Sequence, residues 1–394
     1  MLAIFGPMRF NEIPGQQAIR DRLLQSVKTN RVSHALMLSG SQGCGHYALA
    51  LALAQYLQCT SPLEDDSCGI CPACHQSARF VHPDIHFVFP VARTAKIKDE
   101  ASSDDFIEEW RQYLTENPYP SLEGWYHAID IENKQAGIFK KEAQDILRKL
   151  NFKSYESDYK VIIFWMPEKM NASAANKLLK IIEEPADHTV FLFVTSDTDE
   201  ILPTILSRTQ LIKVPRIGSE YLYEKLAGEY PGQEKLVQGA VLRSRGDYLV
   251  AREMIELSDQ NVLNRDRFIR WMRMSYGRQV NVPQVTDITD WVSEVSEIGR
   301  ERQKWFLQYS LGMIRNNFLV NRGLSELATL DADELAFSSK FNAFIHPGNI
   351  EGLMQEFDLA IAQVTMNANP KILLTDMSLQ LHRLLRLPDP GARI

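Results

Sequence analysis

The sequence predicts an α/β module, a parallel sheet flanked by helices, followed by a half that is built only from helices. Short apolar runs alternate with segments of helical periodicity over the first 215 residues, which is typical of strands and helices that succeed one another in a parallel sheet. After Pro215 the strand-like runs vanish and long amphipathic stretches take over. At 394 residues the chain is long enough for two to three domains.

Four short apolar runs predict buried strands, and two of the segments beside them predict helices. One helix is expected from Tyr47 to Gln58 and another from Asn171 to Glu184, where Asn171 can cap the first turn. Pro185 ends the second helix, because a proline pushes the residue before it out of the helical region. The predicted strands are 35–39, 161–165, 190–194 and 210–214.

One stretch interrupts this alternation and sets the predicted domain division. Residues from about 88 to 132 show no clear pairing of strands with helices and are predicted to form a largely helical surface insertion. The helical half is predicted to divide near residue 275. The expected parts are therefore an α/β domain at 1–215, a small helical lid at 216–275 and a larger helical bundle at 276–394.

The composition of the chain excludes several classes of protein. The net charge of −7 comes from 43 basic and 50 acidic residues, so no basic field over the whole molecule exists to hold nucleic acid. No apolar run is long enough for a membrane span. The N-terminus lacks a basic region followed by a sustained apolar stretch, so we expect a cytoplasmic location.

The segment GSQGCGHY at residues 40–47 lies between a predicted strand and a predicted helix, where a phosphate-binding loop belongs. His46 stands at the lysine position of G-x-x-x-x-G-K-[ST], where it is too short and mostly uncharged at neutral pH. Tyr47 lacks the short hydroxyl that binds Mg²⁺. Either the loop is a tight turn without a ligand, or it is a degenerate nucleotide site. Its residues are Gly40, Gly43, Gly45, His46 and Tyr47.

The strand at 161–165 leads to a second degenerate motif. In a nucleotide hydrolase, an acidic pair follows such a strand and serves Mg²⁺ and the attacking water. Trp165 and Met166 stand there instead, and Glu168 comes too late unless it swings back. Two motifs thus depart independently from the pattern of an active nucleotide site, which argues against ATP hydrolysis by this chain.

Four of the five cysteines, Cys59, Cys68, Cys71 and Cys74, lie within residues 59–74. Two consecutive C-x2-C steps bring three thiolates together, and the fourth completes a tetrahedral sulfur set for one Zn²⁺ ion. Four protein ligands leave no open position, so the site is predicted to be structural. The alternatives are four free thiols, or substitution by one of the nearby histidines, which are His75, His82 and His86.

The sequence Ser207-Arg208-Thr209 follows a short apolar segment and precedes the last predicted strand. An arginine in this place can be a solvated surface charge. It can also be an arginine finger that reaches the triphosphate of a neighbouring subunit, where a planar and permanent charge is needed.

Together these features resemble the AAA+ module of bacterial DNA polymerase III clamp-loader subunits, in particular the delta prime branch of that family. The resemblance covers residues 1–215 and extends more weakly through the helical half. The third residue of the Ser-Arg motif is usually Cys in this family and is Thr209 here. The segments that carry the resemblance are Ser33–Ala35, Gly40–Tyr47, the four cysteines, His82–Asp84, Ala174–Pro185 and Ser207–Arg208.

The resemblance implies a non-hydrolysing subunit of a five-subunit ring, with motor and delta-type subunits as partners, which helps to load a sliding clamp onto primed DNA. It implies that residues 276–394 form an oligomerisation collar and that Arg208, with Ser207, is an arginine finger acting in trans. Two alternatives stay open. One is an ATP-hydrolysing motor subunit of the same loader. The other is a zinc-ribbon DNA-binding protein, against which the acidic residues Glu64, Asp65 and Asp66 argue.

Overall fold

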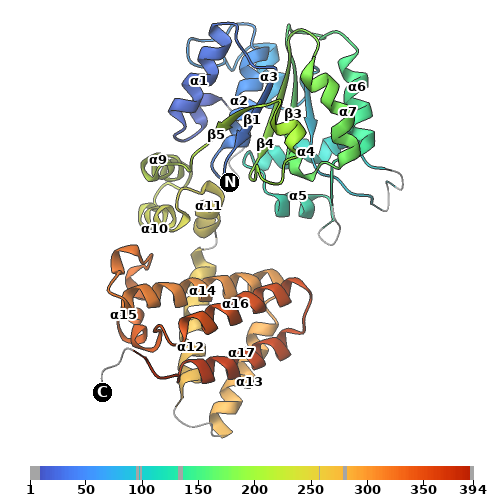
Figure 1. Ribbon diagram of the computed structural model, residues 1–394. Helices are drawn as coiled ribbons and strands as arrows, with labels where there is room; N and C mark the ends of the chain where they lie inside the picture. Colours follow the sequence, from blue (N-terminus) through green and yellow to red (C-terminus); the bar gives the residue numbers. More distant parts are fainter. Residues whose placement is uncertain are drawn as a thin grey trace. The chain divides into compact units, whose positions relative to one another are not determined.

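The computed structural model describes residues 9–94, 97, 100–131, 136–256, 258–277 and 282–390 (Figure 1). The chain divides into two compact units, the first ending at Arg252 and the second beginning at Glu253. Within the described residues no helix is both long and apolar enough to cross a membrane.

The first unit is built around one parallel sheet. Its five strands lie in the order β2-β3-β4-β1-β5, and each neighbouring pair is parallel. The two central strands β3 and β4 are buried along their whole length, as the apolar runs predict. The strands are β1 (Ala35–Ser39), β2 (Ile85–Val88), β3 (Lys160–Trp165), β4 (Thr189–Thr195) and β5 (Gln210–Lys213).

Helices cover both faces of this sheet, as Figure 1 shows. On one face α6 (Lys140–Leu150) and α7 (Ala172–Glu183) pack together over β3 and β4. On the other face α2 (His46–Gln58) lies against β1, β3 and β4 and is buried along its whole length. The remaining helices beside α2 are α1 (Gln17–Lys28) and α3 (Pro72–Ala78).

Helix α7 follows directly from its sequence. The Asn171 side chain accepts a hydrogen bond from the backbone N–H of Ala174 at 2.8 Å, so it caps the first turn as predicted. Ala174, Leu178 and Ile182 recur at helical spacing and are fully buried against the sheet. The helix ends at Glu183, two residues before Pro185.

The predicted insertion is largely helical, with the 3₁₀ turn η2 (Ser103–Phe106), α4 (Ile107–Glu116) and α5 (Leu122–Ala128), and its first residue belongs to β2. Its helices have an exposed side, but Trp110 and Trp125 are fully buried. The sequence pattern does not reveal this burial, because Trp110 packs against residues far away in the sequence. Residues 95, 96, 98, 99 and 132 of the predicted insertion lie outside the described part of the chain.

Three further helices complete the first unit. They are α9 (Ser219–Glu229), α10 (Glu234–Ser244) and α11 (Tyr248–Glu256), the last of which crosses the boundary between the units. The remaining described short elements of this unit are the 3₁₀ turns η1 (Phe10–Glu12) and η3 (Pro167–Lys169) and the short helix α8 (Pro203–Leu206).

The second unit is helical in all its described elements. Its core contains Trp271, Trp291 and Phe357, which are fully buried. The proposed three-part division of the chain stays a prediction; α12, which it assigned to the lid, packs with α13, α14 and α17. The elements are α12 (Ser258–Tyr276), α13 (Val282–Ser296), α14 (Arg300–Asn321), η4 (Ser325–Leu327), α15 (Ala332–Phe341), η5 (Asn342–Phe344), α16 (Ile350–Thr365) and α17 (Pro370–Leu384).

Candidate functional site

The glycine loop at residues 40–45 joins β1 to α2, at the carboxyl end of the strand, as the sequence predicts. Gly43 and Gly45 have positive φ angles of 73° and 91°, which favour glycine. A Cβ atom at Gly40 would lie 2.5 Å from Cys44 Sγ and 2.6 Å from the carbonyl oxygen of Val214. Glycine is therefore required at these positions of the loop, and its surroundings are closely packed.

His46 does not replace the missing lysine. Its side chain is only 7% exposed, and burial lowers the pKa of the imidazole to about 4. The ring is therefore neutral at pH 7 and cannot supply the cation that β- and γ-phosphates require. Its Nδ1 lies 3.4 Å from the Sγ of Cys44, which is itself buried.

Tyr47 and Trp165, at the two positions that would serve Mg²⁺, belong to one aromatic cluster. The ring of Tyr47 meets Trp165 edge-on at 6.4 Å and Trp110 of the insertion at 6.1 Å. Trp110 also packs against Trp165 at 5.1 Å and stacks on Phe89 at 4.3 Å. The residues at these two motif positions thus belong to one aromatic cluster rather than to a set of metal ligands.

Further members of this cluster come from the insertion. Trp125 meets Trp110 edge-on at 4.8 Å and donates a hydrogen bond from Nε1 to the carbonyl oxygen of Pro90 at 2.8 Å. Sequence reasoning missed this role. One signal was present in the sequence. Aromatic residues occur both in the insertion and at the two degenerate motifs, which is consistent with packing between these segments.

The mouth of the loop is covered by residues of the same chain. Tyr119 of the insertion stacks on Tyr248 at 4.4 Å, and a Cβ atom on Gly45 would lie 3.5 Å from the Tyr119 ring. The backbone N–H of Tyr248 donates to the carbonyl oxygen of Gly43 at 3.1 Å. A Cβ atom on Gly43 would overlap the Asp247 carboxylate.

Asp247 is held in this place by its own helix. Its Oδ1 accepts a hydrogen bond from the backbone N–H of Val250 at 3.1 Å, which caps the start of α11. Burial raises the pKa of this carboxyl above its usual range. No local pattern predicts that a residue 204 positions after Gly43 contacts the loop.

Glu168 follows the end of β3 closely, and burial raises the pKa of its carboxyl group. Its Oε2 atom has no hydrogen-bond partner among the described residues. Met166, which stands at the second acidic position, is half-buried with a left-handed backbone at φ 57°.

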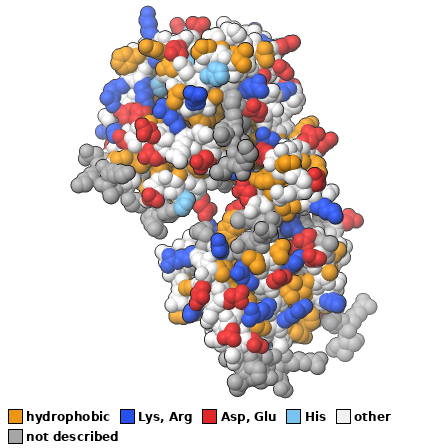
Figure 2. All heavy atoms as spheres, turned by 180° about the vertical axis from the view of Figure 1, so that it is seen from behind, with side chains coloured by type: hydrophobic (Ala, Val, Ile, Leu, Met, Phe, Trp, Pro, Cys, Tyr) orange, Lys and Arg blue, Asp and Glu red, His pale blue; other side chains and the backbone are white. Residues whose placement is uncertain are grey.

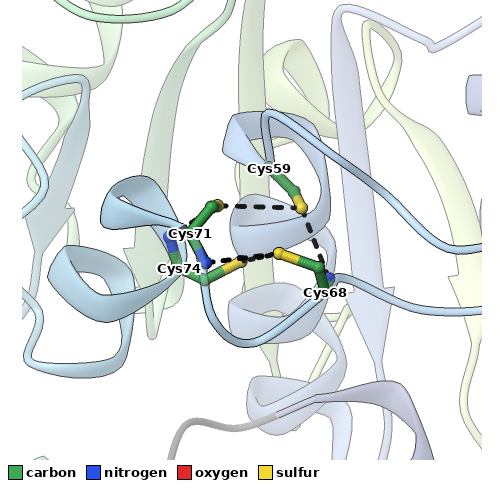
Figure 3. Close-up of side chains that lie close together, drawn as sticks. All are labelled: Cys59, Cys68, Cys71 and Cys74. Carbon is green, nitrogen blue, oxygen red and sulfur yellow. Dashed lines mark hydrogen bonds between the residues drawn. The ribbon is translucent and has the colours of Figure 1, made fainter.

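The four predicted cysteines lie together (Figure 3). Their sulfur atoms are all within 4.8 Å of one another, with Cys59 and Cys71 separated by 4.0 Å and Cys68 and Cys74 by 3.8 Å. Tetrahedral Zn²⁺ with bonds of about 2.3 Å requires separations of about 3.8 Å, so the set fits one zinc ion. Four thiolates leave no coordination position open, which fits a structural ion.

Local sequence arranges these ligands. Cys59 follows α2, and Cys71 is the N-cap of α3, where Pro72 begins the helix. Hydrogen bonds from backbone N–H groups reach the sulfur atoms of Cys59, Cys68 and Cys71 at 3.3–3.4 Å. Burial opposes ionisation of Cys71, but hydrogen bonds with Thr60 and Cys74 lower its pKa to about 6.

None of the three candidate histidines belongs to this set among the described residues. His82 is buried and its Nδ1 accepts a hydrogen bond from the backbone N–H of Asp84 at 3.2 Å. Asp66, inside the cysteine loop, is also buried and accepts hydrogen bonds from the backbone N–H groups of Phe10 and Asn11. The module is thereby tied to the N-terminal segment of the same unit.

Ser207 and Arg208 follow α8 directly and precede β5. Ser207 is exposed, and the side chain of Arg208 is 30% exposed. The guanidinium donates to the carbonyl oxygen of Thr204 at 2.9 Å and to Glu183 Oε1 at 3.2 Å. The arginine is thus partly exposed and contacts the end of α7.

Charges are mixed over the face of the molecule seen in Figure 2. Lys and Arg side chains are interspersed with Asp and Glu side chains on this face rather than gathered in one large patch. This distribution agrees with the overall negative charge of the sequence.

The parallel sheet, the loop between β1 and α2 and the arginine after α8 define an AAA+ type module with degenerate nucleotide motifs, followed by helical parts, as predicted. A family model described as DNA polymerase III, delta subunit, matches residues 15–218, more than half of the 394 residues. The chain belongs to this family.

The relatives of this chain are subunits of the same polymerase. It is 27% identical to DNA polymerase III subunit delta′ of Pseudomonas aeruginosa, over 61% of this chain and 60% of the relative. It is 24% identical to subunit delta′ of Haemophilus influenzae, over 68% of each chain. It is also 24% identical to subunit gamma/tau of Mycobacterium bovis, over 52% of this chain but only 28% of that relative.

Among solved structures, a DNA polymerase III gamma subunit-related protein from Thermotoga maritima aligns with 92% of this chain and all of its own, at 15% identity and a TM-score of 0.40.

Proposed function

We propose that this chain is the non-hydrolysing delta prime subunit of a DNA polymerase III clamp loader. It helps to load the sliding clamp onto primed DNA, within a five-subunit ring that also contains motor and delta-type subunits. It contributes a rigid subunit to the ring and one arginine, Arg208, which contacts the ATP that is bound to an adjacent motor subunit. A structural Zn²⁺ ion braces the module at Cys59, Cys68, Cys71 and Cys74.

The observation that supports this proposal is the packing of the chain's own side chains at both degenerate motifs. Tyr47, Trp110 and Trp165 form one aromatic cluster, and Tyr119 and Asp247 lie against the phosphate loop. A metal-binding side chain at position 47 or 165 would have to replace a ring that is buried in the core of the unit. Removing a single buried Trp ring from its packing typically costs about 3–5 kcal/mol.

Charge acts in the same direction as packing. The only side chain at the lysine position is a neutral imidazole, and the nearest carboxylate to Gly43 is that of Asp247. The loop therefore lacks the positive charge that an active site supplies to phosphate at the lysine position.

The runner-up function, an ATP-hydrolysing motor subunit, is favoured by one observation, the similarity to subunits gamma and tau. The purified chain distinguishes the two. We expect no nucleotide binding and no Mg²⁺-dependent ATP hydrolysis by this chain alone. Steady turnover of ATP by the isolated chain would contradict the non-hydrolysing role and support the motor function.

The arginine is tested in the assembled complex. We expect Arg208→Ala to leave the chain folded and assembled but to slow ATP hydrolysis by the adjacent motor subunit by about 10³–10⁵-fold, the usual effect of losing an arginine finger. The measurement is steady-state ATP turnover of the complex in the presence of clamp and primed DNA. If only one of several motor sites depends on Arg208, single-turnover measurement resolves that site.

Arg31→Ala is the matched control, because Arg31 is an exposed arginine in the loop before β1. We expect this variant to behave as the natural protein does. Normal ATP turnover and normal clamp loading with Arg208→Ala would show that the arginine is only a surface charge.

A further inference from the structure

The Arg208 side chain is held by its own subunit. Its guanidinium donates to the carbonyl oxygen of Thr204, to the hydroxyl of Ser207 at 3.4 Å and to the carboxylate of Glu183 at 3.2 Å. The first two partners are one turn or less away in the chain. Glu183 is different, because it comes from the end of another helix, α7.

The ion pair between Arg208 and Glu183 is a weak one. The carboxylate of Glu183 is 56% exposed, and the contact uses one hydrogen bond rather than the bidentate geometry of a strong pair. The Nε atom of Arg208 is buried and has no hydrogen-bond partner among the described residues. The guanidinium therefore keeps unused donor capacity while it lies against α7.

A triphosphate and Glu183 would compete for the same group. Both are anionic oxygen acceptors for the terminal nitrogens of the guanidinium, and each repels the other when both lie beside it. A phosphate that approaches Arg208 would therefore weaken the Glu183 contact, because the two anions repel each other beside the guanidinium.

We propose that Glu183 is a positioning residue that holds the Arg208 guanidinium against its own subunit until the nucleotide of the neighbouring subunit takes the place of the Glu183 carboxylate. This inference rests on the proposed function of Arg208 in trans. An exposed ion pair changes an equilibrium by about fivefold at most. The contact with Glu183 therefore weakens the binding of Arg208 to the neighbouring nucleotide but does not prevent it.

The test uses the complete complex with Glu183→Gln, which keeps the size of the side chain but removes its charge. We expect ATP turnover at the adjacent motor site to rise by about two- to fivefold at low ionic strength. The gain narrows as salt is added, because salt screens the natural ion pair at the surface. Glu184→Gln is the matched control, since Glu184 is the exposed neighbour that follows Glu183.

A double-variant cycle separates positioning from a merely structural role. In an Arg208→Ala background, Glu183→Gln should have no further effect on ATP turnover. If Glu183→Gln leaves ATP turnover unchanged or lowers it, Glu183 does not hold Arg208 back. The same conclusion follows if the effect of Glu183→Gln persists in the Arg208→Ala background. If Arg208→Ala itself leaves turnover unchanged, the proposed function fails instead. Thermal unfolding of each variant verifies that the fold is kept.

Discussion

Single side chains at the two degenerate motifs are buried in the core of the first unit. An active loop places a lysine and a small hydroxyl residue where His46 and Tyr47 stand, and both of these are buried here. The neutral imidazole and the aromatic ring need no counter-charge, so they cost less to bury than an unpaired lysine would. Trp165 does the same at the end of β3, and its ring contacts that of Tyr47.

One buried carboxyl carries a pH dependence of its own. Glu142, in the first turn of α6, is 1% exposed, and its Oε2 accepts a hydrogen bond from the backbone N–H of Ser103 at 2.5 Å. Burial raises its pKa from the ordinary 4.5 to about 7. Below pH 4.5 both the folded and the unfolded chain hold the proton, so the group has no pH-dependent effect there.

Between pH 4.5 and 7 only the unfolded chain loses this proton, so the free energy of unfolding falls as the pH rises. The loss reaches about 3 kcal/mol above pH 7, at 1.36 kcal/mol for each pKa unit. We expect Glu142→Gln to remove this slope, measured by urea unfolding at several pH values. Glu109→Gln, on the exposed face of α4, should keep it. An unchanged slope in Glu142→Gln would show that another group is responsible.

Whole elements differ in how far the sequence predicts them. Helix α7 was predicted from its cap, its apolar periodicity and its proline, and all three signals are local. Strand β2 was missed because it has four residues and leads straight into the insertion. The helices of the insertion show an apolar face, but the partners of that face are Tyr47 and Trp165, which lie on other elements. Contacts between distant segments leave no local pattern.

The candidate site follows the same rule. The degenerate motifs and the cysteine cluster were found from spacing, because each is a short continuous segment. The roles of Tyr119, Asp247 and Glu183 were not found, because each side chain contacts its functional neighbour across the fold. Their residue types are common at surfaces and turns, so nothing in the sequence alone separates them from ordinary polar or aromatic residues.

The cysteine module is an element whose stability should depend on the zinc ion that we propose for it. A loop with few apolar residues gains its fold from metal binding, because no preformed site exists in the unfolded chain. We expect about one zinc ion per chain in the natural protein and substantial loss of zinc from Cys74→Ser. Elemental analysis of the dialysed protein measures this. Loss of the ion should also expose residues 59–78 to proteolysis.

Cys44→Ala is the control for the zinc experiment, because Cys44 is buried in the glycine loop and stands outside the four-sulfur set. We expect this variant to retain its zinc. Equal zinc content in both variants, or a natural protein that binds no zinc, would show that the four cysteines are free thiols.

At the scale of the molecule, the chain consists of two units with separate cores. The sheet and its helices form the first, and the second is organised around a group of buried tryptophan and phenylalanine rings. Helix α12 belongs to the second core, since Phe268, Trp271 and Met272 are buried in it. The boundary predicted near residue 275 would cut these side chains from the partners that they contact.

This difference predicts how fragments behave. We expect residues 253–394 to unfold cooperatively in urea and to keep a near-ultraviolet circular dichroism signal. Residues 276–394 lose the stack of Trp271 on Trp291 at 4.7 Å and the hydrogen bond from Trp271 Nε1 to Ser378 Oγ at 2.8 Å. Each lost buried ring costs about 3–5 kcal/mol, against a total of about 5–15 kcal/mol for a domain. The shorter fragment should therefore lack fixed tertiary structure, and equal cooperativity of the two fragments would place the boundary after α12.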